Sequence, residues 1–275
     1  MKRITILSAA LIIAALTAAV ATSTASPSGG LPTLSIAMNG KRIVVSGTAP
    51  SGAAKIVSTT TNVPAGSPTL VRLEPGVTFG KAFAQVAAHH GDPNYLQGLA
   101  SIVFSAEAPK GTSSAQTMLR PGNYEALDTT SDNPAKWPRT QFTVSAGTSP
   151  ASLPKAQATV KSIDFAFRGP RTLHDGELVR FEDTGFVSHM TLAIRVKNAA
   201  IARKLTALLI AAKEKQAMPL GLGLVSLQGT VSPGAVQQQV LHANPGVYVL
   251  VCFMDTQDGR EHIRLGMERT IRVTK

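Results

Sequence analysis

Three residues with sulfur or nitrogen donor atoms follow one another near the C-terminus. Cys252, the only cysteine of the 275-residue chain, ends the apolar run Tyr248–Cys252. His262 follows after nine intervening residues, and Met267 follows after four more. A thiolate, an imidazole and a thioether suit copper, particularly when a second imidazole comes from another part of the chain. This stretch is therefore the first candidate for a metal site.

A second imidazole lies upstream, in a loop between two apolar segments. The segment 178–183 has the pattern of a strand, and a loop containing Gly185 follows it. His189 stands at the end of this loop, where the next apolar segment begins. We therefore expect His189 at the start of a strand.

The ordered set His189, Cys252, His262 and Met267 resembles that of the cupredoxin family, and the resemblance covers most of residues 157–275. It implies that the two histidines and the cysteine bind copper, with the methionine as a weak axial ligand. The chemistry agrees, because two imidazoles and a thiolate form a trigonal copper site with a long thioether contact on its axis.

The interval between Cys252 and His262 departs from the family pattern, in which it spans only a few residues. Lengthening such a loop from about four to nine residues costs only about 0.7 kcal/mol in closure entropy. Because Asp258-Gly259 is a hairpin-turn signal, we expect the loop to fold back as a short ribbon. The long interval weighs against electron-transfer copper but leaves metal binding in place.

Two halves of the chain resemble each other at an offset of about 123–124 residues. Each half also contains a segment with apolar residues at helical spacing, at 79–90 and at 199–215. The pattern predicts an internal duplication of one domain type. The matching segments are Leu119–Tyr124 with Ala243–Tyr248, and Thr69–Leu73 with Leu192–Val196.

Short apolar runs among 17 prolines and 23 glycines indicate an all-β protein. We expect two tandem Greek-key β-sandwich domains of the cupredoxin type, each with a short helical insertion. The predicted organisation is a signal peptide and flexible start at 1–30, a first domain at 31–145, a linker at 146–156 and a second domain at 157–275.

The first half lacks the ligand set at the corresponding positions. Gly66 stands in place of His189, and Asp128 stands in place of Cys252. The segment 133–138 contains neither a histidine nor a methionine. The first domain is therefore expected to be a scaffold or a binding module.

Two further features of the first half have alternative interpretations. Trp137, the only tryptophan, is expected to pack against the sandwich, and an exposed contact residue is the alternative. His89 and His90 stand at the end of the predicted helix beside Asp92. There the cationic form of a histidine suits the helix dipole, and a second metal site is the lesser hypothesis.

The N-terminus has the pattern of a secretory signal peptide. Lys2 and Arg3 precede the apolar run Leu7–Val20, and the small residues Ser23-Thr24-Ala25 follow it. A membrane anchor is the alternative, although the run is shorter than the about 20 residues that a span needs. We therefore expect a secreted, extracytoplasmic protein without a membrane span after signal removal.

The charge is strongly positive, but it is scattered along the chain. The formal net charge of +11 becomes +9 when Lys2 and Arg3 are removed. No run of five basic residues occurs, which argues against nucleic-acid binding. An acidic redox or cell-envelope partner is the expected contact, with a merely solubilising charge as the alternative.

These features predict an exported copper-binding protein that acts in electron transfer or copper handling. The alternative is a metal-free extracellular module with a binding or structural role. We expect no enzyme and no catalytic residues. Val251 and Phe253 flank Cys252 where a multicopper oxidase needs histidines, no His-x-His pair occurs, and the chain has only six histidines. A Gly-x-Ser-x-Gly motif of serine hydrolases is also missing from the sequence.

Overall fold

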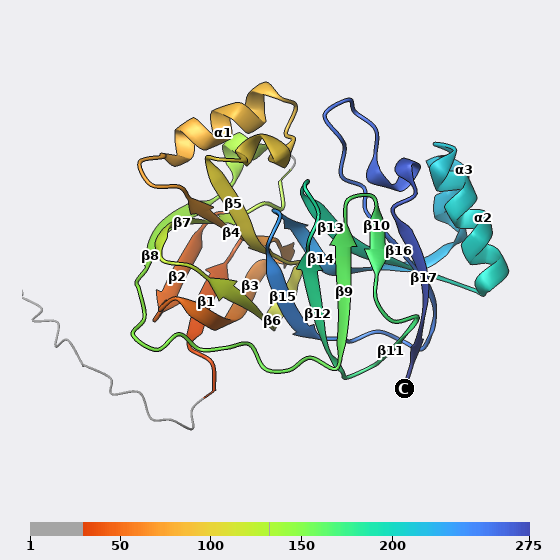
Figure 1. The fold of residues 1–275 in the computed structure, drawn as a ribbon, viewed down its shortest axis with the longest axis horizontal. Coiled ribbons are helices and arrows are strands. Elements are labelled where there is room, and N and C mark those ends of the chain that lie inside the picture. Colours follow the sequence, from red (N-terminus) through yellow and green to blue (C-terminus); the bar gives the residue numbers. More distant parts are fainter. Residues whose placement is uncertain (1–29, 132) are drawn as a thin grey trace, which may run out of the picture. The chain divides into compact units, whose positions relative to one another are not determined.

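Strands predominate in the computed structural model, which describes residues 30–131 and 133–275 (Figure 1). Within these residues the strands form three sheets, in agreement with the all-β prediction. The predicted signal peptide at 1–30 lies, apart from Gly30, outside the described residues. In the part of the chain that is described, no helix is both long and apolar enough to cross a membrane.

Alternating buried and exposed side chains mark most strands of both halves. The strands of the first half are β1 (Thr33–Met38), β2 (Ile43–Gly47), β3 (Gly52–Gly66), β4 (Pro68–Leu73), β5 (Ala100–Ser105), β6 (Ala108–Leu119), β7 (Gly122–Asp128) and β8 (Arg139–Val144). Those of the second half are β9 (Ala158–Ile163), β10 (Ala166–Arg168), β11 (Thr172–His174), β12 (Leu178–Asp183), β13 (His189–Val196), β14 (Gly221–Val231), β15 (Val236–Val240), β16 (Gly246–Val251) and β17 (Glu268–Thr274). The helices are α1 (Phe79–Ala88), α2 (Ala199–Ile210) and α3 (Glu214–Ala217), with short 3-10 helices η1 (Pro93–Leu96), η2 (Pro134–Lys136), η3 (Met218–Leu220) and η4 (His262–Leu265).

The first half is a sandwich of two sheet layers. One layer has the strand order β6-β3-β1-β2 and the other has the order β5-β4-β7-β8. Ile36 and Ile56 from the first layer share one buried cluster with Phe104 and Tyr124 from the second. Burial of these large apolar side chains between the layers is the main stabilising term of this half.

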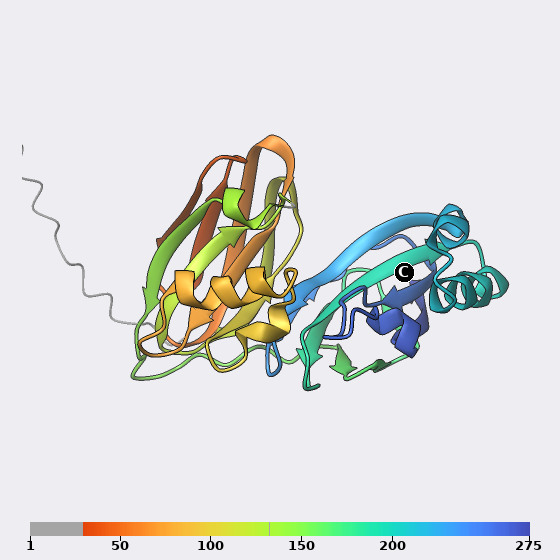
Figure 2. The same ribbon diagram turned by 90° about the horizontal axis from the view of Figure 1, so that it is seen from above.

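The second half repeats this arrangement. Strands β10-β9-β12-β15 form one layer, and β11-β17-β16-β13-β14 form the other. Phe181 from the first layer and Leu250 from the second lie in one buried cluster, together with Cys252 and Met267. Two of the four predicted site residues are therefore core residues of this sandwich. Figure 2 shows β13 and β14 running side by side as a long curved ribbon.

The two halves share one sheet. Strand β15 pairs with β6, which lies beside it in the centre of Figure 1. Gln237 lies opposite Thr117, and Gln238 lies opposite Gln116. The Thr117 hydroxyl also donates to the Val236 carbonyl at 2.8 Å. The sequence predicted two tandem sandwiches but not this continuous sheet, because the pairing joins residues more than a hundred positions apart. The predicted domain boundaries stay a prediction.

Equivalent tyrosines make the same contact in each half. The Tyr124 hydroxyl donates to the Arg120 carbonyl at 2.8 Å, and the Tyr248 hydroxyl donates to the Asn244 carbonyl at 2.7 Å. Each tyrosine lies near the start of its strand, just after the Pro-Gly turn that the repeat comparison identified. The matched segments thus occupy equivalent places in the two sandwiches.

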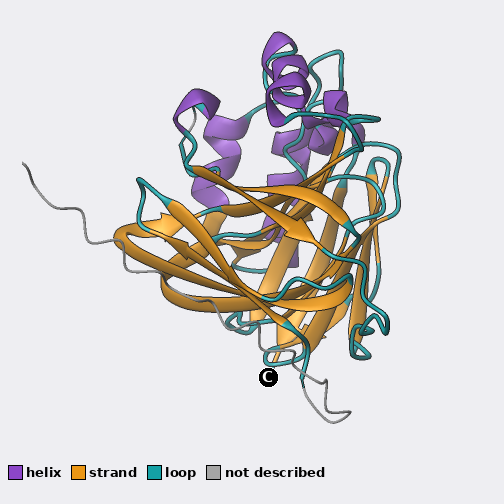
Figure 3. Ribbon diagram, turned by 90° about the vertical axis from the view of Figure 1, so that its left-hand side faces the viewer, coloured by secondary structure: helices purple, strands orange, loops and turns teal. Residues whose placement is uncertain are grey.

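The helices lie where their apolar spacing placed them, with one correction. Helix α1 begins at the predicted residue, but the segment predicted as one helix at 199–215 contains a break. Ala212 adopts a left-handed backbone with φ of 57°, and the Lys213 amide donates to the Leu208 carbonyl at 2.8 Å. Helix α2 ends there in a left-handed turn, and its apolar cluster, which includes Leu205 and Leu209, continues into α3 through Ala217. Figure 3 shows the helices gathered at one side of the strands.

Candidate metal centre

The cysteine is placed by the central strand of the second-half sheet. Strand β16 pairs with β13 on one side and with β17 on the other, and Cys252 follows its last residue. Its side chain is fully buried in the core of the second sandwich. An apolar strand that is paired on both edges has little freedom, so the position of the sulfur is fixed before any metal binds.

His189 begins the neighbouring strand β13, as the sequence predicted. Its imidazole is fully buried, and the preceding loop wraps closely around it. At Gly185 a Cβ atom would lie 2.9 Å from Nε2 of His189 and 2.7 Å from the Asp164 amide nitrogen. This close approach of the backbone explains why the loop carries glycine there.

His262 is the first residue of the 3-10 helix η4 and is also fully buried. The loop that leads to it folds back as the predicted short ribbon, with a bridge between Asp255 and Glu261. The Thr256 amide donates to the Arg260 carbonyl at 2.9 Å within this ribbon. The nine-residue interval therefore has internal structure of its own.

Backbone hydrogen bonds connect the ribbon to the rest of the site. The His262 amide donates to the Met254 carbonyl at 2.8 Å, and the Ile263 amide donates to the Cys252 carbonyl at 3.0 Å. The two bonds join both ends of the ribbon. The imidazole of His262 is thereby held beside the thiol despite the ten-residue separation in sequence.

The three donor atoms converge on one point. Nδ1 of His189 lies 3.2 Å from Nδ1 of His262, and Sγ of Cys252 lies 3.4 Å from the second nitrogen and 3.9 Å from the first. The point equidistant from all three atoms is about 2.0 Å from each, close to metal–nitrogen and slightly below metal–sulfur bond lengths. Among the described residues these three form the one His/Cys/Asp/Glu group compact enough to hold a metal ion.

Met267 occupies the core next to this group. It is fully buried in the same apolar cluster as Cys252, and its amide donates to the His262 carbonyl at 3.0 Å. Gly266, just before it, has a left-handed backbone with φ of 93° that ends η4 and turns the chain into β17. The backbone of the fourth predicted site residue is therefore bonded directly to that of the third.

Burial keeps the three side chains uncharged when no metal is present. It raises the pKa of the Cys252 thiol to about 12. Burial and the nearby His262 lower the pKa of His189 to about 3, and burial lowers the pKa of His262 as well. Neutral imidazoles keep a lone pair free for a metal, whereas the thiol must lose its proton on binding.

Outer groups support this arrangement. The Met190 amide points at the Cys252 sulfur, 3.5 Å away, and is placed to donate to a thiolate. The carboxylate of Asp183 lies 4.0 Å from Nε2 of His189, and burial raises the pKa of Asp183 to about 7. The ring of Phe165 packs edge-on against His262 with centroids 5.1 Å apart. Such outer contacts orient metal ligands and exclude water.

The chemistry of the three donor atoms fits one metal ion. The Nε2 atoms of His189 and His262 have no hydrogen-bond partner among the described residues, so each ring is held mainly by packing and by its Nδ1 side. Two nitrogens and one sulfur in a trigonal arrangement are typical of a soft or borderline metal.

The first half has a hydrogen-bonded aspartate, not a metal ligand set, at the position equivalent to Cys252. Asp128 is buried where the second half has Cys252, and its carboxylate accepts hydrogen bonds from the Ser67 amide at 3.0 Å and from the Thr130 hydroxyl at 2.5 Å. The carboxylate thus closes the end of β7 by hydrogen bonding.

The other features of the first half have structural roles. His89 stacks on Tyr95 with ring centroids 3.5 Å apart, and Asp92 accepts from the Asn94 amide at 2.8 Å to cap η1. Trp137 is half-buried and packs edge-on against Phe83, as the packing interpretation predicted.

Sequence reasoning missed residues that act through tertiary contacts. Asn94 of η1 accepts from the Ser188 amide at 2.7 Å, beside His189. Asp183 and the Met190 amide were also missed. The position of Asp183 at a strand end before a glycine-containing loop was a usable signal, but no local pattern marks Asn94.

Known proteins of similar structure include copper proteins. The structure is similar to auracyanin B, with 17% identity over 45% of this chain and 93% of that chain and a TM-score of 0.27. It is also similar to reduced auracyanin from Roseiflexus castenholzii, with 17% identity over 42% and 95% of the two chains and a TM-score of 0.27. A Cu-containing nitrite reductase from Thermus scotoductus SA-01 is similar at 12% identity over 90% and 69%, with a TM-score of 0.25. No protein-family model matches the sequence, and no curated protein does.

The second half has the two-layered β-sandwich that the resemblance to cupredoxins implied. Two facing sheets enclose an apolar core; His189 begins β13, and Cys252 directly follows the neighbouring strand β16. His262 and Met267 follow in the order that the resemblance implied.

Proposed function

We propose that the second half binds one copper ion through His189, Cys252 and His262, with Met267 as a weak axial ligand. The convergence of Nδ1, Nδ1 and Sγ at 3.2, 3.4 and 3.9 Å is the observation that supports this proposal best. Copper is preferred over zinc because the set combines trigonal nitrogen and thiolate donors with a methionine nearby. When bound, the metal supplies a one-electron redox couple.

Each residue has a distinct task in the proposed site. Cys252 loses its thiol proton on binding, and the Met190 amide stabilises the resulting thiolate. His189 and His262 present neutral Nδ1 atoms, which burial favours. Asp183 lies near Nε2 of His189 and stabilises the imidazole as charge is drawn from it.

We propose electron transfer or copper handling outside the cytoplasm as the biological role. The donors are fixed by paired strands and by the hydrogen-bonded ribbon, and a rigid site changes little in geometry when the metal changes charge. The predicted signal peptide supports export, and the positive net charge of the chain supports an acidic redox or envelope partner. The paired tyrosine contacts support an origin of the two halves by internal duplication.

Copper binding is tested on the mature, metal-free protein. One equivalent of Cu(II) is expected to give a visible thiolate-to-copper band and to remain bound after desalting. Cys252→Ser should abolish the band, and His262→Ala should weaken retention at least tenfold. His174→Ala is the matched control, because His174 is exposed and lies outside the donor group. If wild-type protein shows no band and retains no copper, the proposal is wrong.

The second candidate function is a metal-free extracellular module, and one observation favours it. The separation of 3.2 Å between the two Nδ1 atoms is also a hydrogen-bond distance, so these two nitrogens can share a hydrogen bond without an ion. Retention of the metal-free protein on cell-envelope material at low salt, unchanged in Cys252→Ser, would support this function. Loss of that retention in Cys252→Ser, or no retention at all, would count against it.

A further inference from the structure

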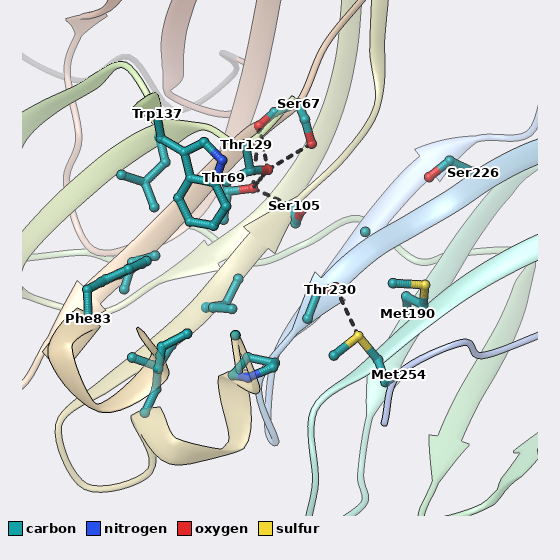
Figure 4. Close-up of a pocket in the computed structure, with 18 of the residues that line it drawn as sticks. Ser67, Thr69, Phe83, Ser105, Thr129, Trp137, Met190, Ser226, Thr230 and Met254 are labelled. Atoms are coloured by element: carbon teal, nitrogen blue, oxygen red, sulfur yellow. Dashed lines mark hydrogen bonds between the residues drawn. The ribbon is translucent and has the colours of Figure 1, made fainter. Parts of the chain in front are cut away.

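A cavity of about 340 Å³ lies where the two halves meet (Figure 4). Strands β4 and β5 and helix α1 of the first half contribute to its wall, and strands β13 and β14 of the second half complete it. Clefts and cavities that bind small ligands occupy roughly 300–1,000 Å³. The size of this space fits a small ligand.

Specific contacts between the two halves fix their spacing around this cavity. Backbone atoms of Ile102 bond both to the Ser232 hydroxyl and to the Ser232 amide, each at 2.9 Å. At Gly229 a Cβ atom would collide with the Ser105 hydroxyl, so strands β14 and β5 already touch there. The cavity therefore cannot close by a simple approach of the two halves.

One end of the cavity is lined by hydroxyl groups. Thr69 is hydrogen-bonded to Ser105 at 3.0 Å and to Thr129 at 3.2 Å, and the Thr129 hydroxyl lies 3.0 Å from that of Ser67 (Figure 4). A hydroxyl has one donor and two acceptor sites, so this network has acceptor capacity left for a ligand. The group can recognise one hydroxyl on a bound molecule.

The rest of the wall is mainly apolar, apart from the hydroxyls of Ser226 and Thr230 on β14. Phe83 and Trp137 line one side, and the thioethers of Met190 and Met254 line the opposite side in Figure 4. Among the described residues, no charged side chain lines the cavity. A charged ligand would lose its hydration without gaining a counter-ion, which excludes it on energetic grounds.

We propose that this cavity is a binding site for a small, uncharged, apolar molecule that carries one hydroxyl group. The hydroxyl lies in the cluster of Ser67, Thr69, Ser105 and Thr129, and the apolar body fills the space between Trp137 and the two methionines. Thioethers and aromatic rings adapt well to apolar ligands of varied shape. Binding needs no metal, so this site goes beyond the proposed copper function and is independent of it.

The only tryptophan of the chain makes the site measurable, because Trp137 lines the cavity. The metal-free mature protein is titrated with 6-bromohexan-1-ol, whose bromine quenches indole fluorescence on contact. We expect saturable quenching. The matched probe 1-bromohexane lacks the hydroxyl and should bind about three- to tenfold more weakly, the value of one hydrogen bond.

Two variants locate the probe. Ser226→Leu projects a larger side chain into the cavity from β14 and should weaken binding at least tenfold, whereas Ser149→Leu, an exposed position outside the lining, should not. Thr69→Val removes one hydroxyl at nearly constant volume and should bring the two probes to similar affinity. Far-UV circular dichroism verifies that each variant is folded.

Three results would overturn the proposal. These are quenching that never saturates, equal binding in wild type and Ser226→Leu, and equal binding of the two probes to wild type. Repeating the titration on Cys252→Ser separates the two functions, because the cavity is expected to bind normally where copper is lost. Failure of copper binding alone leaves the cavity proposal intact, and the reverse also holds.

Discussion

The side-chain carbonyl of Asn94 accepts a hydrogen bond from the backbone amide of Ser188 at 2.7 Å. This contact joins η1 in the first half to the residue that precedes His189 in the second. Ser188 is buried, so its amide has no access to water as an alternative partner. The half without the ligand set therefore helps to fix one proposed ligand of the other half.

Replacing Asn94 with alanine tests this contact. Asn94→Ala leaves the Ser188 amide buried without a partner, which we expect to cost about 1–3 kcal/mol of unfolding free energy. Copper retention should weaken roughly tenfold, because the loop before His189 loses its anchor. Urea unfolding of the metal-free protein and copper competition with a chelator measure the two effects.

A matched substitution distinguishes the effect of losing the buried contact from the effect of removing any asparagine side chain. Asn123 is exposed, and its side-chain carbonyl accepts from the Thr143 hydroxyl at 3.3 Å. Asn123→Ala should change the unfolding free energy by less than about 0.5 kcal/mol and leave copper retention unaltered. Equal behaviour of the two variants would refute the role of Asn94.

Gly185 is the second position where the surroundings of His189 can be tested. Gly185→Ala would place a methyl group 2.9 Å from Nε2 of the imidazole and 2.7 Å from the Asp164 amide nitrogen. We expect copper affinity to fall at least tenfold and stability to fall by about 1–3 kcal/mol, because the ring or the loop must move. Gly223→Ala is the control, since no heavy atom lies within 4 Å of its added Cβ. An unchanged affinity in Gly185→Ala would show that the loop adapts without moving the ring.

The sequence predicted the parts of this site that depend on local order. His189, Cys252 and His262 could be selected because each follows or begins an apolar strand or lies in a loop with a clear turn signal. The strand at 178–183 followed from its apolar pattern, and the ribbon after Cys252 followed from Asp258-Gly259. These features depend on neighbours within a few residues.

The remaining features depend on tertiary pairing, which local pattern does not encode. The shared sheet requires Gln237 to meet Thr117, and the support of His189 requires Asn94 to reach Ser188 across 94 residues. The break at Ala212 was missed for a related reason. The apolar spacing continues beyond α2, and Ala217 of α3 packs in the same cluster as Leu209, so the spacing does not mark the turn.

Met267 can be tested as an axial ligand without a large change in packing. Met267→Leu keeps the buried volume, so we expect a loss of less than about 1.5 kcal/mol in unfolding free energy. Copper should remain bound, but the visible band and the reduction potential should shift, because the axial contact tunes both. Met118→Leu changes a partly exposed methionine and serves as the control. Identical spectra and potentials in Met267→Leu and wild type would assign Met267 to the core alone.

The buried thiol gives the metal-free protein a specific dependence on pH. Burial raises the pKa of Cys252 from 9.0 to about 12, so the folded state keeps the thiol proton at pH values where the unfolded state loses it. Raising the pH through this window therefore favours unfolding, by up to about 1.4 kcal/mol per pH unit. Below pH 9 the contribution is fully present, and it is lost progressively as the pH approaches 12.

A comparison with Cys252→Ala isolates this effect from other groups that titrate at high pH. Between pH 8 and pH 10.5 the wild type should lose about 2 kcal/mol more unfolding free energy than the variant, whatever their difference at pH 8. Tyrosines and lysines are common to both proteins, so their contribution cancels in the comparison. Urea unfolding at the two pH values gives the free energies, and absorbance of the thiolate near 240 nm gives the titration directly. If both proteins lost the same free energy, the Cys252 thiol would have to titrate alike in the folded and unfolded chains, and its burial against the two imidazoles would be wrong.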